Sequence, residues 1–127
     1  MFSEGLLNGT VHTCIGQELS GVGISKYLNE NDFVFSNHRC HGHYISFTKK
    51  YKNLIDELMG KESGVCGGIG GSQHIASDNF FSNGPQGALA PVAVGVAEGL
   101  KRKKNNSISV CFIGDGTMGE GIIYESM

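Results

Sequence analysis

The 127-residue sequence has no long apolar run and no strong charge of one sign, and each absence excludes a class of protein. No apolar stretch is long enough to cross a bilayer as a helix, so no membrane partner is expected. The 10 Lys and Arg residues are interspersed with 12 Asp and Glu residues, which argues against a nucleic-acid partner or a membrane-surface patch. The first residues carry neither the basic nor the apolar segment of a signal peptide. We therefore expect a cytoplasmic protein, and an organellar location stays open because the N-terminus is expected to be incomplete.

The sequence also lacks a close pair of cysteines. Its four cysteines lie far apart and form no CxxC pair: Cys14, Cys40, Cys66 and Cys111. A zinc site or redox motif is therefore not expected, and reduced, partly buried thiols are predicted instead. Glycine, in contrast, is abundant, with 20 residues that are clustered rather than periodic. Such clusters indicate close approaches of the backbone rather than a collagen-like repeat.

Hydrophobic periodicity predicts three helices and two strands. Helices are expected at residues 17–28, 51–59 and 91–104, and strands at 33–36 and 108–113. The strand at 108–113 is almost continuously apolar, so we expect it to be buried on both faces and to form an α/β unit with the helix before it. A further helix is expected to begin near residue 121. We therefore expect the chain to be a piece of a longer protein.

Two segments between these elements are unusual. Residues 64–74 contain five glycines within eight positions, which is compatible with a flexible linker or with an ordered loop that approaches a ligand or partner. The apolar Ile75, Phe80 and Phe81 just after it favour an ordered loop. Residues 37–43 contain three histidines, whose spacing fits neither the HExxH nor the zinc-finger pattern. Since Arg39 in the same segment offers a fork of donors suited to phosphate, we expect this loop to contact an anion rather than a metal.

The turn Gly114-Asp115-Gly116 ends the strand at 108–113 and places a carboxylate at its carboxyl end. Ligands of open parallel sheets bind at this edge. Glycines beside Asp115 would let a diphosphate approach the backbone, and the start of the following helix would supply N–H donors. A single carboxylate facing a diphosphate is an arrangement that Mg²⁺ uses, with phosphate oxygens completing its coordination.

Taken in order, these segments resemble the α subunit, or E1 component, of the thiamine-diphosphate-dependent 2-oxo acid dehydrogenases. Each matching segment is short, but their collinear order along the chain makes the resemblance specific. The matching segments are His12 with Gly16-Gln17-Glu18, His38-Arg39-Cys40-His41-Gly42, residues 56–61, residues 70–74, residues 87–91 and Gly114-Asp115-Gly116.

The resemblance implies a fold, two cofactors and a set of site residues. The fold would be α/β, a doubly wound and mostly parallel sheet of the thiamine-diphosphate-binding type, left incomplete, with residues 1–127 as part of the diphosphate- and metal-binding domain. The cofactors would be thiamine diphosphate and Mg²⁺, with Asp115 as the metal ligand and His12 as the catalytic residue near the cofactor. The implied cofactor-binding residues are His38, Arg39, Gly84, Gln86, Gly114, Gly116 and Thr117.

The resemblance also implies a reaction and partners. The enzyme would oxidatively decarboxylate a 2-oxo acid such as pyruvate and pass the acyl group to a lipoyl carrier protein. An E1 β-like subunit in a heterotetramer would supply the glutamate that activates the cofactor. We therefore expect the 127 residues alone to bind the cofactor weakly and to turn over no substrate.

Two departures from the family pattern keep alternatives open. His38 stands where the family has tyrosine, and residues 117–120 are closer to the transketolase side of the superfamily. The first alternative is a transketolase-like or other thiamine-diphosphate-dependent transferase or decarboxylase. The second is a non-catalytic fragment that serves only in assembly.

Overall fold

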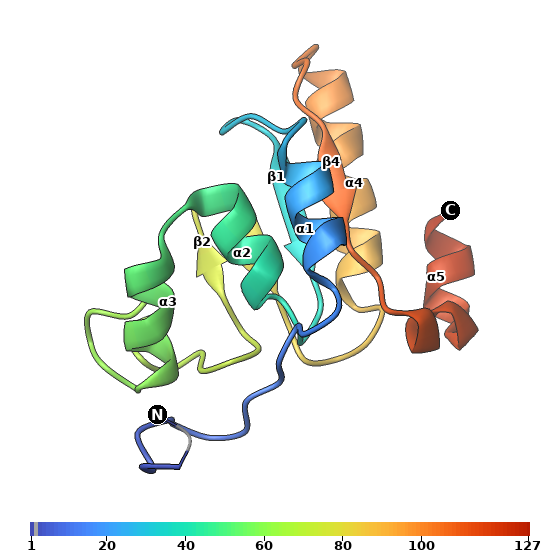
Figure 1. Cartoon of the computed structure of the whole chain (residues 1–127). Helices are drawn as coiled ribbons and strands as arrows, with labels where there is room; N and C mark the ends of the chain where they lie inside the picture. The colour runs from blue at the N-terminus through green and yellow to red at the C-terminus, as the bar shows by residue number, and fades with distance from the viewer. Residues whose placement is uncertain (2) are drawn as a thin grey trace.

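The computed structural model describes Met1 and residues 3–127 as helices packed around one small sheet (Figure 1). The elements in chain order are α1 (Glu18–Ser25), β1 (Phe33–Ser36), α2 (His41–Thr48), α3 (Tyr51–Leu58), β2 (Ala76–Ser77), β3 (Phe80–Ser82), α4 (Leu89–Arg102), β4 (Ser109–Cys111), the 3₁₀ helix η1 (Asp115–Gly119) and α5 (Gly121–Ser126). None of the helices in this part of the chain is long and apolar enough to cross a membrane.

The four strands form one mixed sheet in the order β2-β3-β1-β4. Strand β1 lies in the middle and pairs in parallel with β3 on one side and with β4 on the other, whereas β2 pairs with β3 in antiparallel orientation. The chain crosses from β1 to β3 and then returns past β1 to β4. Because parallel crossovers are right-handed, connections in opposite directions must cover opposite faces of the sheet.

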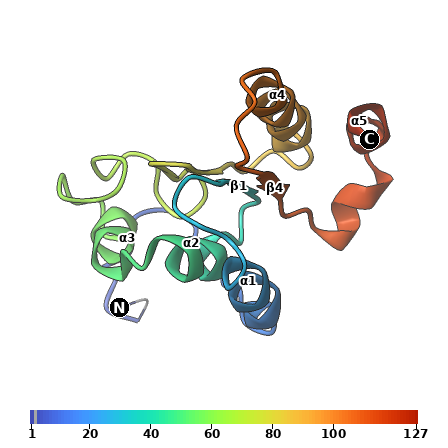
Figure 2. The same ribbon diagram turned by 90° about the horizontal axis from the view of Figure 1, so that it is seen from above.

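Figure 2 shows this arrangement, with α1, α2 and α3 on one face of the sheet and α4 on the other. The predicted α/β class and mostly parallel sheet are therefore confirmed. Since β1, β3 and β4 run in the same direction, the loops that follow them leave from one edge of the sheet. This edge is where the Gly-Asp-Gly turn lies.

Most of the predicted elements form, some with different ends. Strand β1 has the predicted bounds, α3 ends one residue early, and Gly60 follows it with φ +68°, as expected for a residue after a helix. Helix α4 begins and ends two residues before the predicted bounds. Helix α1 stops at Ser25 rather than at residue 28. Helix α5 begins at Gly121, as predicted.

Two expectations were wrong, and one pair of strands was missed. Strand β4 is shorter than 108–113 and only half-buried, because it lies at the edge of the described sheet with a neighbour on one side. The segment 37–43 is a loop only as far as Cys40, since α2 begins at His41. The hairpin of β2 and β3 was not predicted, because strands of two and three residues carry too little periodicity to recognise.

The core lies between the sheet and helices α2 and α3. Its buried cluster consists of Val34, Cys40, Tyr44, Leu54, Ile75 and Phe80. The rings of Tyr44 and Phe80 meet edge to face at 5.2 Å, which joins α2 to β3. Burial raises the pKa of the Cys40 thiol to about 11. The cysteines are free, as predicted, and Cys40 is fully buried while the other three are partly buried.

The glycine-rich segment is an ordered loop rather than a linker. The carboxylate of Glu57, which is 0% exposed, accepts backbone N–H groups from Cys66 and Gly68 through Oε2 and from Gly71 through Oε1, at 2.6, 2.9 and 2.9 Å. The loop therefore folds around a buried charge at the end of α3. This gives it a fixed position beside the carboxyl edge of the sheet.

Candidate functional site

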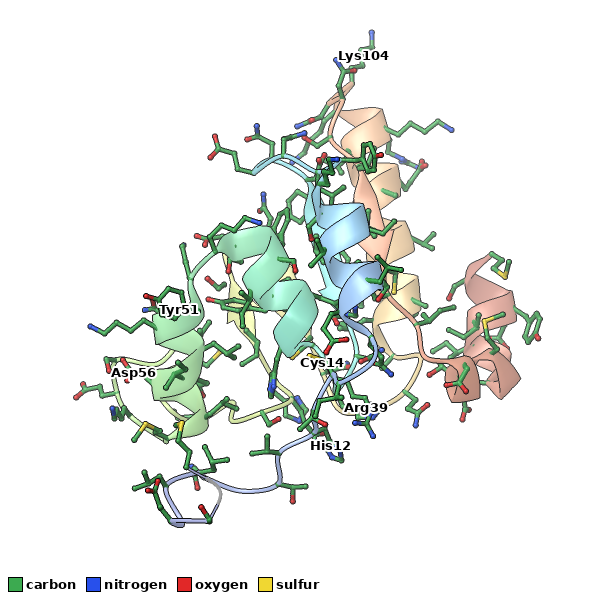
Figure 3. The ribbon with its side chains drawn as sticks, in the orientation of Figure 1. His12, Cys14, Arg39, Tyr51, Asp56 and Lys104 are labelled. Carbon is green, nitrogen blue, oxygen red and sulfur yellow. The ribbon has the colours of Figure 1, made fainter. Side chains whose placement is uncertain are left out.

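Loops from three parallel strands converge at the carboxyl edge of the sheet. A small cavity of about 10 Å³ lies between them and is lined by Ser36 at the end of β1 and Asn37 after it, by Asn83 and Pro85 after β3, and by Phe112 after β4, among others. The N-terminal segment passes the same edge. Figure 3 shows His12, Cys14 and Arg39 together there, with Lys104 at the opposite end of the molecule.

Asp115 is the first residue of η1 and is exposed to solvent. It lines a cleft of about 580 Å³ together with Gly114, Asn37, Gln17 and His43, among others. Within the described residues Asp115 forms no ion pair, so its carboxylate is available for a cation. The cleft lies between the start of α1 and the loop that follows β4.

A hydrogen bond joins the β3 loop to the β4 loop beside Asp115. The hydroxyl of Thr117, which is buried in η1, donates to Gln86 Oε1 at 2.8 Å. Gly87 precedes α4 with φ +76°, and a Cβ there would lie 2.7 Å from Ile122 Cγ2, so only glycine fits between the loop and α5. Gln86, Gly116 and Thr117 therefore form one unit of the predicted site.

Arg39 and two histidines form a second, cationic unit. The Nη1 group of Arg39 donates to Thr13 O at 2.5 Å, and the rings of His12 and His38 meet edge to face at 5.0 Å. Burial lowers the pKa of His38, and the nearby His12 and Arg39 lower it further. The permanent charge of Arg39 beside these rings makes a site for an anion. No ion pair joins Arg39 to Asp115 in the described part of the chain.

Ser72 is a site residue that sequence reasoning missed. Its hydroxyl accepts the backbone N–H of His12 at 3.3 Å, and both its carbonyl and its hydroxyl oxygen lie within 3.0–3.1 Å of His41 Nε2. Burial lowers the pKa of His41, and the hydrogen bond to the Ser72 carbonyl opposes that effect. Ser72 therefore ties the glycine-rich loop to His12. The only available signal was its place in the segment 70–74.

The three histidines of segment 38–43 have separate roles. His38 contacts His12 and His41 contacts Ser72, as above, while His43 Nδ1 lies 2.8 Å from the hydroxyl of Ser36. Among the described residues, no group of three or more His, Cys, Asp or Glu side chains gathers as a metal site. Gly84, a predicted cofactor residue, lies in the loop after β3, two residues before Gln86, and a Cβ there would be 2.5 Å from Gln73 Oε1.

We expect His43 to make the protein sensitive to acid. Burial lowers its pKa to about 4, whereas the imidazole titrates near 6.5 in the unfolded chain. Between these values the unfolded chain binds more protons, so stability is full above about pH 7 and falls as the pH drops to 4, by about 3 kcal/mol for this group. Urea unfolding of the protein and of a His43→Phe variant at pH 7.5 and 4.5 would measure it. Equal acid losses in both proteins would contradict the assignment.

The chain matches the family model described as "Dehydrogenase E1 component" over residues 2–127. It is 37% identical to the alpha subunit of acetoin:2,6-dichlorophenolindophenol oxidoreductase from Bacillus subtilis (strain 168), over 100% of this chain and 39% of that subunit. It is 33% identical to the testis-specific mitochondrial form of the pyruvate dehydrogenase E1 component subunit alpha from Rattus norvegicus, over 99% of this chain and 32% of that protein. The chain thus spans about a third to two fifths of the length of these relatives, 32% and 39%.

Proposed function

The chain belongs to the dehydrogenase E1 component family, and we propose that it forms the part of an E1 α subunit that binds thiamine diphosphate and Mg²⁺. The observation that carries this proposal is the convergence of three strand-end loops: Asp115 and the Gln86–Thr117 unit lie at the same edge of the sheet from which the loop with Arg39 leaves β1. The whole enzyme would oxidatively decarboxylate a 2-oxo acid such as pyruvate. An E1 β-like subunit and a lipoyl carrier protein would be its partners.

The backbone around Asp115 fits a diphosphate bound through a metal ion. A Cβ at Gly119 would meet nothing within 4 Å, and at Gly114 or Gly116 it would meet only Thr117 Oγ1 at 3.6 Å or Gln86 Oε1 at 3.8 Å. This exposed backbone leaves room for phosphate oxygens to approach. One free carboxylate beside such a surface supports Mg²⁺, which takes few protein ligands and completes its octahedron with phosphate oxygens and water.

Each unit of the site would have its own task. Asp115 would hold the metal, and Gly114, Gly116 and Thr117 would line the diphosphate, with Thr117 fixed by its bond to Gln86. Arg39 and His38 would bind the diphosphate from the β1 side. When bound, thiamine diphosphate supplies the nucleophilic carbon and the electron sink that decarboxylation requires.

The remaining residues would prepare the site for substrate. The imidazole of His12 would face the reacting end of the cofactor, where Ser72 fixes its backbone. Main-chain groups of Gly84 and Gln86 would hold the aminopyrimidine. The lowered pKa of His38 would keep this ring neutral near pH 7, so that Arg39 supplies the permanent charge of the cationic unit.

The test is the affinity of the protein for thiamine diphosphate in the presence of Mg²⁺, measured by calorimetry. Asp115→Asn keeps the shape of the side chain but removes the charge, and we expect affinity to fall about a hundredfold, the upper end of what losing even an outer-sphere metal partner costs. The matched control is Asp78→Asn, an exposed aspartate that pairs with Lys50 and lies just before β3, at the edge of the sheet opposite the site. Equal affinity in both variants would overturn the assignment of Asp115.

A further inference from the structure

His43 is a buried polar residue that the proposed function does not use. It lies in α2, is 5% exposed, and contacts three other elements at the carboxyl edge of the sheet. Its Nδ1 atom lies 2.8 Å from the hydroxyl of Ser36, the last residue of β1. Its ring stacks on Phe112 at 3.8 Å between centroids and 11° between planes. The third contact is with Ser20 of α1, 3.4 Å from Nε2.

The hydrogen bonds assign the tautomer of His43. The hydroxyl of Ser20 donates its single proton to Gln17 O at 2.8 Å, so toward His43 its oxygen can only accept. Nε2 therefore carries the proton, and Nδ1 accepts the proton of Ser36. A neutral ring with a proton on Nε2 satisfies both serines, which agrees with the low pKa of this group.

The contacts of His43 lie next to the two loops that carry the proposed site. Ser36 immediately precedes the loop from Asn37 to Cys40, which contains Arg39, and Phe112 precedes Gly114 and Asp115. Phe112 also donates its backbone N–H to Phe35 O at 2.8 Å, which extends the β1–β4 ladder to this point. The side chains of His43, Asn37 and Asp115 line the same cleft.

We propose that His43 is a positioning residue, which through Ser36 and Phe112 fixes the directions in which the chain leaves β1 and β4 and so sets Arg39 relative to Asp115. That Arg39 and Asp115 bind thiamine diphosphate and Mg²⁺ rests on the proposed function. The positions of the two loops can be measured without a cofactor. A hydrogen bond to one strand end and a flat stack on the other restrain both loops from a single rigid ring.

Gly21 offers a way to disturb this ring without changing it. A Cβ on Gly21 would lie 3.0 Å from His43 Cδ2 and 3.3 Å from the backbone of Gly42, so Gly21→Ala must move His43 or the start of α2. Gly23 lies two positions further along α1, where a Cβ meets nothing within 4 Å. Gly23→Ala therefore adds the same methyl group to the same helix and is the matched control.

The experiment compares the amide chemical shifts and the histidine tautomers of the 127-residue protein and its variants by NMR. We expect His43 in the Nε2–H form, shifted amides at 37–39 and 112–116 in Gly21→Ala, and unchanged amides there in Gly23→Ala. Titration with thiamine diphosphate and Mg²⁺ should show about tenfold weaker binding by Gly21→Ala only. An Nδ1–H tautomer, or the same amide shifts in both variants, would overturn the proposal.

A second set of variants separates positioning from packing. His43→Phe keeps a ring against Phe112 but leaves the hydroxyl of Ser36, which is 2% exposed, without its partner. Adding Ser36→Ala removes that unpaired hydroxyl and should restore most of the lost stability. Under our proposal the double variant regains stability, but the amide chemical shifts of its loops still differ from those of the unmodified protein. If both the stability and the amide shifts returned to their original values, His43 would have only a packing role. If the unmodified protein binds no thiamine diphosphate, the proposed function fails, and the amide shifts still decide the role of His43.

Discussion

Replacing Glu57 with alanine is expected to lower the free energy of unfolding by about 3 kcal/mol, since three charge-assisted hydrogen bonds are lost and their donors are left unpaired. The three donors are the backbone N–H groups of Cys66, Gly68 and Gly71, all in the glycine-rich loop. Water can reach part of the loop once the carboxylate is gone, so the loss is smaller than three full hydrogen bonds. The loop should become mobile before the core unfolds.

Urea unfolding measures the loss in the free energy of unfolding. Hydrogen exchange at the three donor amides measures the local loss of protection in the loop. Glu62→Ala is the matched control, because Glu62 is an exposed glutamate five residues further along the chain. Glu57→Gln should fall between the two, since its amide oxygen can accept but its NH₂ group faces N–H donors. Equal stability of the Glu57→Ala and Glu62→Ala variants would show that the buried carboxylate does not hold the loop.

Loss of the Glu57 carboxylate would also disturb the candidate site. Ser72 follows Gly71 directly and fixes the backbone of His12 through its hydroxyl. A mobile glycine-rich loop would therefore release His12 and the contact between Ser72 and His41. Glu57 stabilises the site from a position that does not touch it.

How far the sequence predicts the fold depends on how local each signal is. Helix α4 was recognisable, because its apolar positions recur at helical spacing and basic residues occupy its last turn. Helix α2 was not, because its sequence His41–Thr48 mixes polar and apolar residues around the helix. It forms because Tyr44 and His43 find buried partners on the sheet, which is information from distant segments.

The candidate site also combines residues with a local sequence signal and residues whose roles depend on distant segments. Asp115 stood out because glycines flank it at the end of an apolar strand, and Arg39 because its fork of donors suits phosphate and lies in a polar loop after a predicted strand. The residues that hold the glycine-rich loop and His12 in place did not stand out: Glu57 resembles an ordinary helical glutamate, and Ser72 an ordinary loop serine. Their roles arise only when the loop closes on α3 and on the N-terminal segment.

Gly68→Ala is expected to destabilise the protein by about 3 kcal/mol, and Gly67→Ala by about 1 kcal/mol. Both glycines have positive φ, +67° and +77° for Gly67 and Gly68, so both variants bear the cost of placing alanine in the left-handed region. The two positions differ in how much room an added Cβ would have. A Cβ at Gly67 meets nothing within 4 Å, whereas a Cβ at Gly68 would lie 2.5 Å from the carbonyl carbon and 2.6 Å from the oxygen of Gly60.

The overlap at Gly68 is with backbone, so no side chain can turn away to relieve it. The loop must instead move off the end of α3, and the hydrogen bond from Gly68 N–H to Glu57 would break with it. Urea unfolding of the two alanine variants side by side isolates this contact, since the cost in backbone conformation is common to both. Equal losses would mean that the loop can shift at no cost, and that the Glu57 carboxylate rather than close packing fixes its place. A larger loss at Gly68 would mean that the glycine cluster exists because the loop backbone packs directly against the helix end.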